Sequence, residues 1–189
     1  VGIIDISNFG KYICHGNGAH EFLDRIFANK IPEKVGASCL SPIIGKMGGI
    51  SADATITKIN DNTFWVVSSG AAEGFQQRFF NLKELDEDTK FTSKSNDYCG
   101  FNVAGPKSRD LLQRLSNKDL SKEAWPFFKS GSLAIAGIEC VALRVSFTGD
   151  LGWELYCDEH DQLALYEVLI KSASQIGGGP VGSRALMSL

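Results

Sequence analysis

The sequence predicts an α+β fold made of two packed βαββα units with antiparallel or mixed sheets. Two observations support this prediction: β-rich runs and helical patterns follow in the same order in both halves of the chain, and the halves share a faint internal similarity. The chain has 189 residues, of which 43% are hydrophobic and 22% charged. This composition is typical of soluble globular proteins, and the length is sufficient to bury a sizeable core.

The internal similarity appears when the halves are compared at an offset of about 88 residues. In each half a short β-type run reaches a glycine turn, and apolar residues then recur at helical spacing. The aligned pairs are Gly16 with Gly105, Phe22 with Leu111, Leu23 with Leu112, Arg25 with Arg114, and Ile26 with Leu115. A strand followed by a helix is therefore predicted twice.

The first unit is expected to begin with a strand over 12–14 and to continue as a hairpin. Two β-rich runs, 54–59 and 63–67, flank Asn60-Asp61-Asn62, which predicts a hairpin turn. A helix is expected to follow over 73–82.

The second unit is expected to repeat this order. Its predicted strands are 101–103, 140–146 and 153–157, with a turn at Thr148-Gly149-Asp150, and a helix is expected over 161–172.

The boundary between the units is expected in the polar stretch 86–96, which gives 1–90 as the first unit and 91–189 as the second. A connector this short predicts intimate packing of the units. The apolar start at Val1–Ile4 and the end at Leu189, inside an expected helix, suggest a piece of a longer protein.

Charge and hydropathy argue against nucleic-acid and membrane partners. The net charge is −3, and the sequence has no basic block interleaved with aromatic residues. Its longest apolar runs, such as 64–67 and 133–136, fall far below the roughly 20 residues of a membrane span, and no signal peptide is apparent.

Several common site motifs are absent from the sequence. The five cysteines show no CxxC spacing, which argues against a disulfide framework or a zinc site and favours a reducing compartment, hence a cytoplasmic location. His15, His20 and His160 are scattered, and no GxSxG surrounds a serine. Gly16-Asn17-Gly18 lacks the third glycine of a dinucleotide loop, so a helix-entry turn is the preferred interpretation.

Asp53 is the first candidate functional residue. It stands among small and apolar residues after the pair Gly48-Gly49, where a strand is expected to begin. Partial desolvation would raise the proton affinity of such a carboxylate and suit a base or an anchor for a cation. The alternative, that Asp53 caps a turn through a backbone hydrogen bond, carries about equal weight.

Glu154 is the second candidate. On the two-residue period of a strand, its side chain shares a face with Gly152 and Tyr156, opposite Trp153 and Leu155. On a solvent face Glu154 would have no special role. In a cleft it could accept two N–H bonds from a heterocycle such as the 2-amino and N3 edge of a pterin.

Five segments of the chain, taken together, resemble the aminomethyltransferase family, which includes the glycine-cleavage T-protein and the folate domains of dimethylglycine and sarcosine dehydrogenases. They are Gly2–Lys11, Gly48–Asp53, Asn102–Pro106, Phe147–Tyr156 and Gly182–Leu186, in the family's order and across essentially the whole chain. The amino-acid sequences of the first, fourth and fifth segments resemble the dimethylglycine and sarcosine dehydrogenase branch more than the T-protein.

The resemblance implies a site for tetrahydrofolate, in which Asp53 is the catalytic carboxylate and Glu154 holds the pterin edge. It also implies that the remaining contacts come from Arg184, Trp65, Val67, Ser69, Phe147, Leu40 and Phe9. Two positions depart from the family pattern. Phe147 stands where tyrosine is common, and Ser69 replaces the amide of the T-protein.

The implied function is the formation of 5,10-methylene-tetrahydrofolate from an iminium intermediate, within a flavoenzyme that oxidises a methylated amine. FAD would belong to a missing N-terminal flavin domain of the same chain, and the family's C-terminal β domain is also missing. The location implied for a eukaryotic protein is the mitochondrial matrix. Two alternatives stay open: a stand-alone aminomethyltransferase or folate-dependent demethylase, and a non-enzymatic folate-binding protein.

Overall fold

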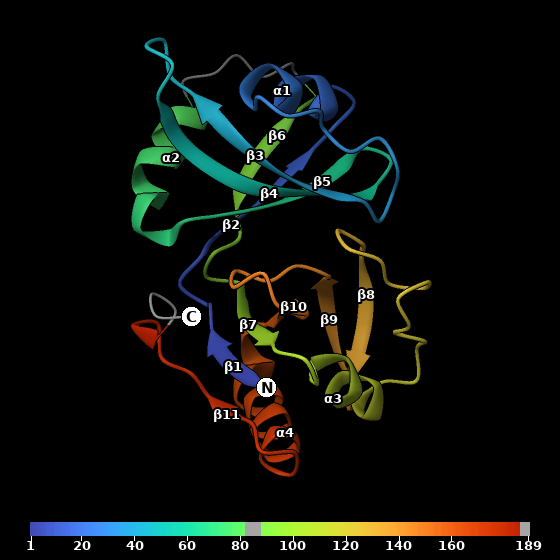
Figure 1. Cartoon of the computed structure of the whole chain (residues 1–189). Coiled ribbons are helices and arrows are strands. Elements are labelled where there is room, and N and C mark those ends of the chain that lie inside the picture. Colours follow the sequence, from blue (N-terminus) through green and yellow to red (C-terminus); the bar gives the residue numbers. More distant parts are fainter. Residues whose placement is uncertain (82–87, 186–189) are drawn as a thin grey trace. The chain divides into compact units, whose positions relative to one another are not determined.

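The computed structural model describes residues 1–81 and 88–185. The chain divides into two compact units. The N-terminal unit is Asn8–Asn96, and the C-terminal unit combines Val1–Ser7 with Asp97–Leu189. Each unit has one sheet (Figure 1). Each also has its own hydrophobic core.

The N-terminal unit has a five-stranded sheet in the order β3-β4-β5-β2-β6, with antiparallel neighbours throughout. Its elements are β2 (Gly10–His15), α1 (Ala19–Ile26), β3 (Ser38–Ile44), β4 (Ile50–Asn60), β5 (Thr63–Ser68), the short helix η1 (Gly70–Ala72), α2 (Glu73–Asn81) and β6 (Lys90–Ser93). Residues of α1 and α2, such as Phe22 and Phe80, pack with residues of the sheet into a single core.

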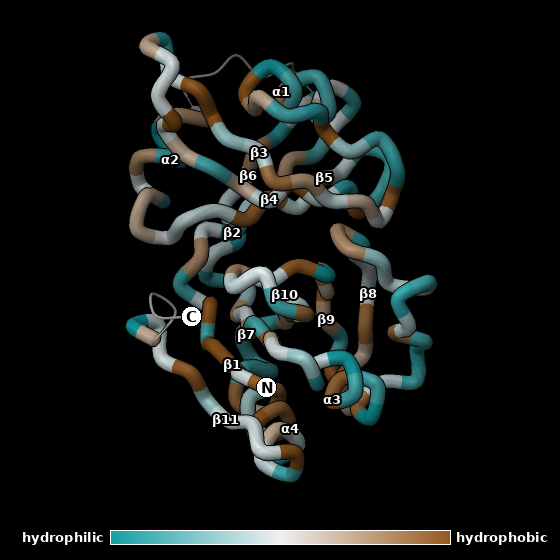
Figure 2. The backbone as a smooth tube through the Cα atoms, in the orientation of Figure 1, coloured by the Kyte–Doolittle hydropathy of each residue, from teal (hydrophilic) through white to brown (hydrophobic). Residues whose placement is uncertain are grey.

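The C-terminal unit has a six-stranded mixed sheet in the order β11-β1-β7-β10-β9-β8, in which only the β1–β11 pair is parallel among the described strands. Its elements are β1 (Gly2–Asp5), β7 (Tyr98–Ala104), α3 (Ser108–Leu115), β8 (Ser130–Ile135), β9 (Ile138–Leu143), β10 (Gly152–Asp158), η2 (Glu159–Asp161), α4 (Gln162–Ser174) and β11 (Gly179–Pro180). Hydrophobic stretches of β1 and α4 stand out against more hydrophilic loops in Figure 2.

The residues that align in the predicted internal repeat occupy equivalent positions in the two units. Helix α1 buries Ala19, Phe22 and Leu23, and α3 buries the aligned Ser108, Leu111 and Leu112, so each helix presents one apolar stripe to its core. Gly16 and Gly105 precede these helices with φ of 127° and 119°, a conformation that favours glycine. The helix-entry interpretation of Gly16-Asn17-Gly18 is thereby confirmed, since Gly18 caps α1.

The predicted hairpins also form. Asn60 pairs with Thr63 across the turn between β4 and β5, and Gly149 has φ of 80° in the turn before β10. The sequence pattern gave no indication of the edge strands β3 and β8, which lack a clear alternation of apolar and polar residues.

The two repeats exchange their first strands. β1 precedes β2 in the chain but pairs with β7, and β6 precedes β7 but pairs with β2. As a result, β1 and β6 occupy equivalent places beside the equivalent strands β7 and β2.

This exchange moves the boundary away from the expected division at 90/91. Residues 1–7 belong to the C-terminal unit because β1 pairs there, and the N-terminal unit extends to Asn96 because it includes β6. The expected connector 86–96 is therefore partly a strand. Residues 86 and 87, Leu82 of the expected helix 73–82, and Leu189, which is expected inside a further helix, lie outside the described residues.

Candidate ligand site

The sheet of the N-terminal unit has one face that packs against its helices and a second face that carries four of the nine predicted site residues. Thr55 pairs with both Leu40 and Val67, and Thr57 pairs with Trp65, so these side chains share one face. Asp53 is two residues from Thr55 on β4 and therefore points the same way. Strand register thus brings together Leu40, Asp53, Trp65 and Val67.

Asp53 lies within β4, opposite Pro42 of β3, and its side chain is exposed. The turn-capping alternative does not apply, because the residue is in a strand. Partial desolvation was also expected for this carboxylate, and the structure contradicts it: Asp53 belongs to the end of β4 where most residues are accessible, before the buried stretch begins at Ala54. An exposed carboxylate is open to a solute molecule.

The other predicted residues of this unit differ in exposure. Trp65 and Val67 are buried, whereas Leu40 is 51% exposed. Ser69 is exposed at the start of η1 and makes no side-chain capping bond there. Phe9 is partly exposed just before β2, and its carbonyl oxygen accepts a hydrogen bond of 2.8 Å from Nζ of Lys11.

Lys11 itself was not predicted as a site residue. It is fully buried and pairs with Val67, so its side chain emerges on the face that carries Trp65 and Asp53. A lysine in the motif Gly10-Lys11 reads as a surface residue in the sequence, and only the strand register places it on this face.

In the C-terminal unit, Glu154 lies on the sheet face opposite the hydrophobic core. Its neighbours Trp153 and Leu155 belong to the core, while Glu154 pairs with Asn102 of β7 and Leu143 of β9. Only 8% of Glu154 is exposed, so it is not a residue of an open solvent face. The two-residue period read from the sequence is confirmed, and it places Tyr156 beside Glu154.

The carboxyl group of Glu154 has an unusual electrostatic environment. The Tyr156 hydroxyl donates a hydrogen bond of 2.8 Å to its Oε2. Burial raises the pKa of Glu154 to about 7, and the hydrogen bond from Tyr156 opposes this shift. Burial and the nearby Glu154 carboxyl raise the pKa of Tyr156, so its hydroxyl keeps its proton. Glu154 can therefore change charge near neutral pH.

Phe147 and Arg184 are exposed on loops of the same unit. Phe147 is 70% exposed in the connection between β9 and β10, and Arg184 lies in a turn after β11. No hydrogen bond or ion pair joins either side chain to Glu154 within residues 88–185.

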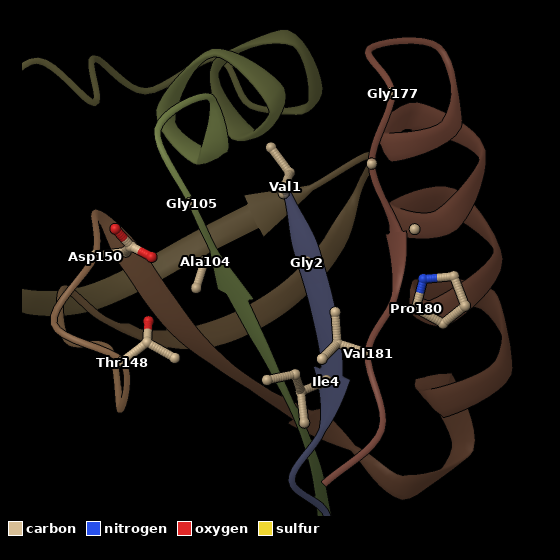
Figure 3. Close-up of a pocket in the computed structure, with 12 residues that line it drawn as sticks. Val1, Gly2, Ile4, Ala104, Gly105, Thr148, Asp150, Gly177, Pro180 and Val181 are labelled. Atoms are coloured by element: carbon tan, nitrogen blue, oxygen red, sulfur yellow. The ribbon is translucent and has the colours of Figure 1, made fainter. Parts of the chain in front are cut away.

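A pocket of about 280 Å³ opens at the β1–β11 edge of the same unit (Figure 3). Its walls are mostly backbone and small residues, including Gly2, Ala104 and Gly178, with Thr148 and Asp150 at one side. Ile4, which also lines it, pairs with Asn102 across β1 and β7. None of the predicted site residues lines this pocket, and Asp150 is its one carboxylate.

No group of three His, Cys, Asp or Glu residues in 1–81 and 88–185 could hold a metal ion. In the same part of the chain, no helix combines the length and apolar character needed to cross a bilayer.

A family model and several known proteins match the chain over nearly its whole length. The family model described as the GCVT N-terminal domain matches residues 1–189. Mouse (Mus musculus) mitochondrial dimethylglycine dehydrogenase is 33% identical over 100% of the chain, which spans 22% of that protein. Mouse mitochondrial sarcosine dehydrogenase is 27% identical over 99% of the chain, again 22% of the relative.

Relatives of which the chain covers about half also match nearly the whole chain. The aminomethyltransferase of Thermoanaerobacter sp. (strain X514) is 26% identical over 96% of the chain, which spans 49% of it. The crystal structure of aminomethyltransferase T of the glycine cleavage system from Bartonella henselae has a TM-score of 0.85 and 20% identity, with 100% of this chain and 49% of that chain covered. This likeness shows that the α+β fold is that of the aminomethyltransferase T-protein. The chain therefore belongs to the family of the GCVT N-terminal domain.

Proposed function

We propose that the chain is the tetrahydrofolate-binding, one-carbon-transfer part of an enzyme of the dimethylglycine or sarcosine dehydrogenase kind. The names of the two dehydrogenase relatives supply the substrate class, a methylated amine. Because the chain spans only 22% of each, the oxidation of the amine would belong to other parts of such an enzyme, where a flavin is expected.

The observation that carries this proposal is the buried carboxyl group of Glu154. A buried carboxyl that is not fully hydrogen-bonded is costly, and its hydrogen-bond partner in the described part of the chain is the Tyr156 hydroxyl. A ligand with two adjacent N–H donors would satisfy the remaining acceptor sites. The 2-amino and N3 edge of a pteridine offers these donors, so the site chemistry fits tetrahydrofolate.

In this proposal Glu154 binds the ligand and Asp53 assists proton transfer. When bound, tetrahydrofolate supplies the nitrogen atoms that accept the one-carbon unit, giving 5,10-methylene-tetrahydrofolate. Glu154 would bind and orient the pteridine. Asp53, an exposed carboxylate on the face that carries Trp65 and Val67, would stabilise the cationic donor and assist proton transfer, and Trp65, Val67, Leu40, Phe9 and Ser69 would supply contacts around it. Phe147 and Arg184, both exposed on loops, would supply further contacts to the folate.

The test is a separation of binding from transfer in the protein that carries this chain. Glu154→Gln should weaken tetrahydrofolate binding at least tenfold, whereas Asp53→Asn should leave the dissociation constant within about twofold and lower the rate of 5,10-methylene-tetrahydrofolate formation from dimethylglycine at least a hundredfold. Asp61→Asn, an exposed carboxylate in the β4–β5 turn, is the control. Unchanged binding and unchanged transfer in both variants would refute the site.

A stand-alone aminomethyltransferase is the second candidate, favoured by the Thermoanaerobacter aminomethyltransferase, which matches 96% of the chain and of which the chain covers 49%. The two functions differ in the donor. Flavin reduction by dimethylglycine supports the first, and transfer from a carrier-bound aminomethyl group without flavin supports the second.

A further inference from the structure

Asn102 is a buried side chain whose amide has no internal partner. It is 2% exposed, and neither Nδ2 nor Oδ1 has a hydrogen-bond partner among the described residues. An unsatisfied polar group in a protein interior costs on the order of 1–3 kcal/mol, and Asn102 has two. The buried amide of Asn102 therefore destabilises the free protein. A ligand that forms the missing hydrogen bonds would explain why it is present.

The position of Asn102 points to which ligand this is. In the antiparallel pair β7–β10, Asn102 is directly opposite Glu154, so both side chains leave the sheet on the face away from the core. The Cβ atoms of such a pair are about 5 Å apart. Phe101 and Val103, on either side of Asn102, belong to the core, which confirms that Asn102 points away from it.

The amide of Asn102 offers one donor and one acceptor side by side, and it can pair with a ring edge that shows the opposite pattern. The pairing of asparagine with the adjacent N6 and N7 atoms of adenine follows this geometry. A tetrahydropteridine has such an edge, since the C4 oxygen accepts and the neighbouring N5–H donates. It lies next to the 2-amino and N3 edge that is assigned to Glu154.

We infer that Asn102 is a second ligand-binding residue beside Glu154, and that it selects the reduced, tetrahydro form of the pteridine. Its Nδ2 donates to the C4 oxygen, and its Oδ1 accepts from N5–H. Oxidised folic acid has no hydrogen on N5, so there Oδ1 would face a second acceptor. A site that hydrogen-bonds a ligand N–H discriminates strongly against a ligand without it. This inference rests on the proposed function and adds to it a residue that distinguishes the reduced pteridine from the oxidised one.

The test compares equilibrium binding of tetrahydrofolate and folic acid to the wild-type chain and to Asn102→Leu, a substitution of similar shape without polar atoms. The wild type is expected to bind tetrahydrofolate at least tenfold more tightly than folic acid. Asn102→Leu should weaken tetrahydrofolate binding at least tenfold and folic acid binding less than threefold, so the preference disappears. Asn17→Leu, which removes an exposed amide from the other unit, should change neither affinity.

Stability provides an independent readout. Because the amide is unsatisfied in the free protein, Asn102→Leu should leave the melting temperature unchanged or raise it, and a marked fall would mean that Asn102 is a structural residue, which overturns the inference. If Glu154→Gln abolishes binding but Asn102→Leu retains the wild-type preference, the role of Asn102 is refuted and the proposed function stands. If the wild type binds neither compound, both are refuted.

Discussion

Glu154 shows how one residue links burial to ligand chemistry. Its side chain is buried on the side of the sheet away from the core, and its pKa is raised to about 7 because burial disfavours the charged carboxylate. The glutamate is then ready to accept N–H donors above this pH and is largely neutral below it. Both stability and binding should therefore depend on pH around neutrality.

The first prediction concerns stability. The pKa of Glu154 in the folded protein lies above the ordinary value of 4.5, so its contribution to stability is fully present below about pH 4.5 and is lost as pH rises through 7. Relative to Glu154→Gln, the free energy of unfolding of the wild type should fall by about 3 kcal/mol between pH 4 and pH 8. Urea denaturation at both pH values measures this, and parallel pH profiles of the two proteins would contradict it.

The second prediction concerns Tyr156, whose hydroxyl stabilises the charged form of Glu154. Removing this donor in Tyr156→Phe should raise the pKa of Glu154 further above 7, because the hydrogen bond lowers it. Carboxyl carbon NMR shifts of Glu154 as a function of pH measure the change. A pKa that stays the same or falls would show that Tyr156 does not govern the charge of Glu154.

At the scale of elements, sequence patterns predicted the hairpins, the helices and the two faces of β10, because each depends on local periodicity and turn chemistry. The grouping of Leu40, Asp53, Trp65 and Val67 came from resemblance, and their shared sheet face explains it. Asn102 and Lys11 could not be identified from the sequence. Their importance depends on which residue of another strand stands opposite each, and periodicity within one strand does not contain that register.

Two glycines test the local backbone requirements. At Gly16, φ is 127° and an added Cβ would lie 2.0 Å from the Asp88 carbonyl oxygen, so Gly16→Ala should lower the free energy of unfolding by more than about 2 kcal/mol. Apart from the nearby backbone of its own helix, Gly74 in α2 has no atom within 4 Å of an added Cβ, and Gly74→Ala should raise stability by about 0.5 kcal/mol. Denaturant melts of both variants decide this, and equal effects would contradict the backbone assignment.

At the scale of the whole molecule, the exchange of first strands couples each repeat to the sheet of the other. Ile3 of β1 is 2% exposed and packs in the core of the C-terminal unit, although the residues that follow it in the chain form the N-terminal unit. At the equivalent position, Phe91 of β6 pairs with Cys14 and packs against the N-terminal core. A division of the sequence into consecutive halves misses this, because strand pairing over long distances leaves no local signal.

Hydrogen exchange tests the exchanged strands. Ile3→Ala should destabilise the C-terminal unit by about 2–4 kcal/mol and speed the exchange of β7 and β10 amides more than those of β2 and β5. Phe91→Ala should have the reverse pattern. If each substitution instead affects the repeat to which it belongs in sequence, the strand exchange is wrong.

The central claim is that Glu154 binds a pteridine, and calorimetric titration of the chain with tetrahydrofolate tests it most directly. The measurement is made at pH 8 on the wild type, on Glu154→Gln, and on Glu139→Gln, an exposed glutamate of the same sheet that serves as the control. The account predicts binding by the wild type and the control, with an affinity at least tenfold lower for Glu154→Gln. Equal affinity of all three proteins, or no binding by any of them, would contradict it.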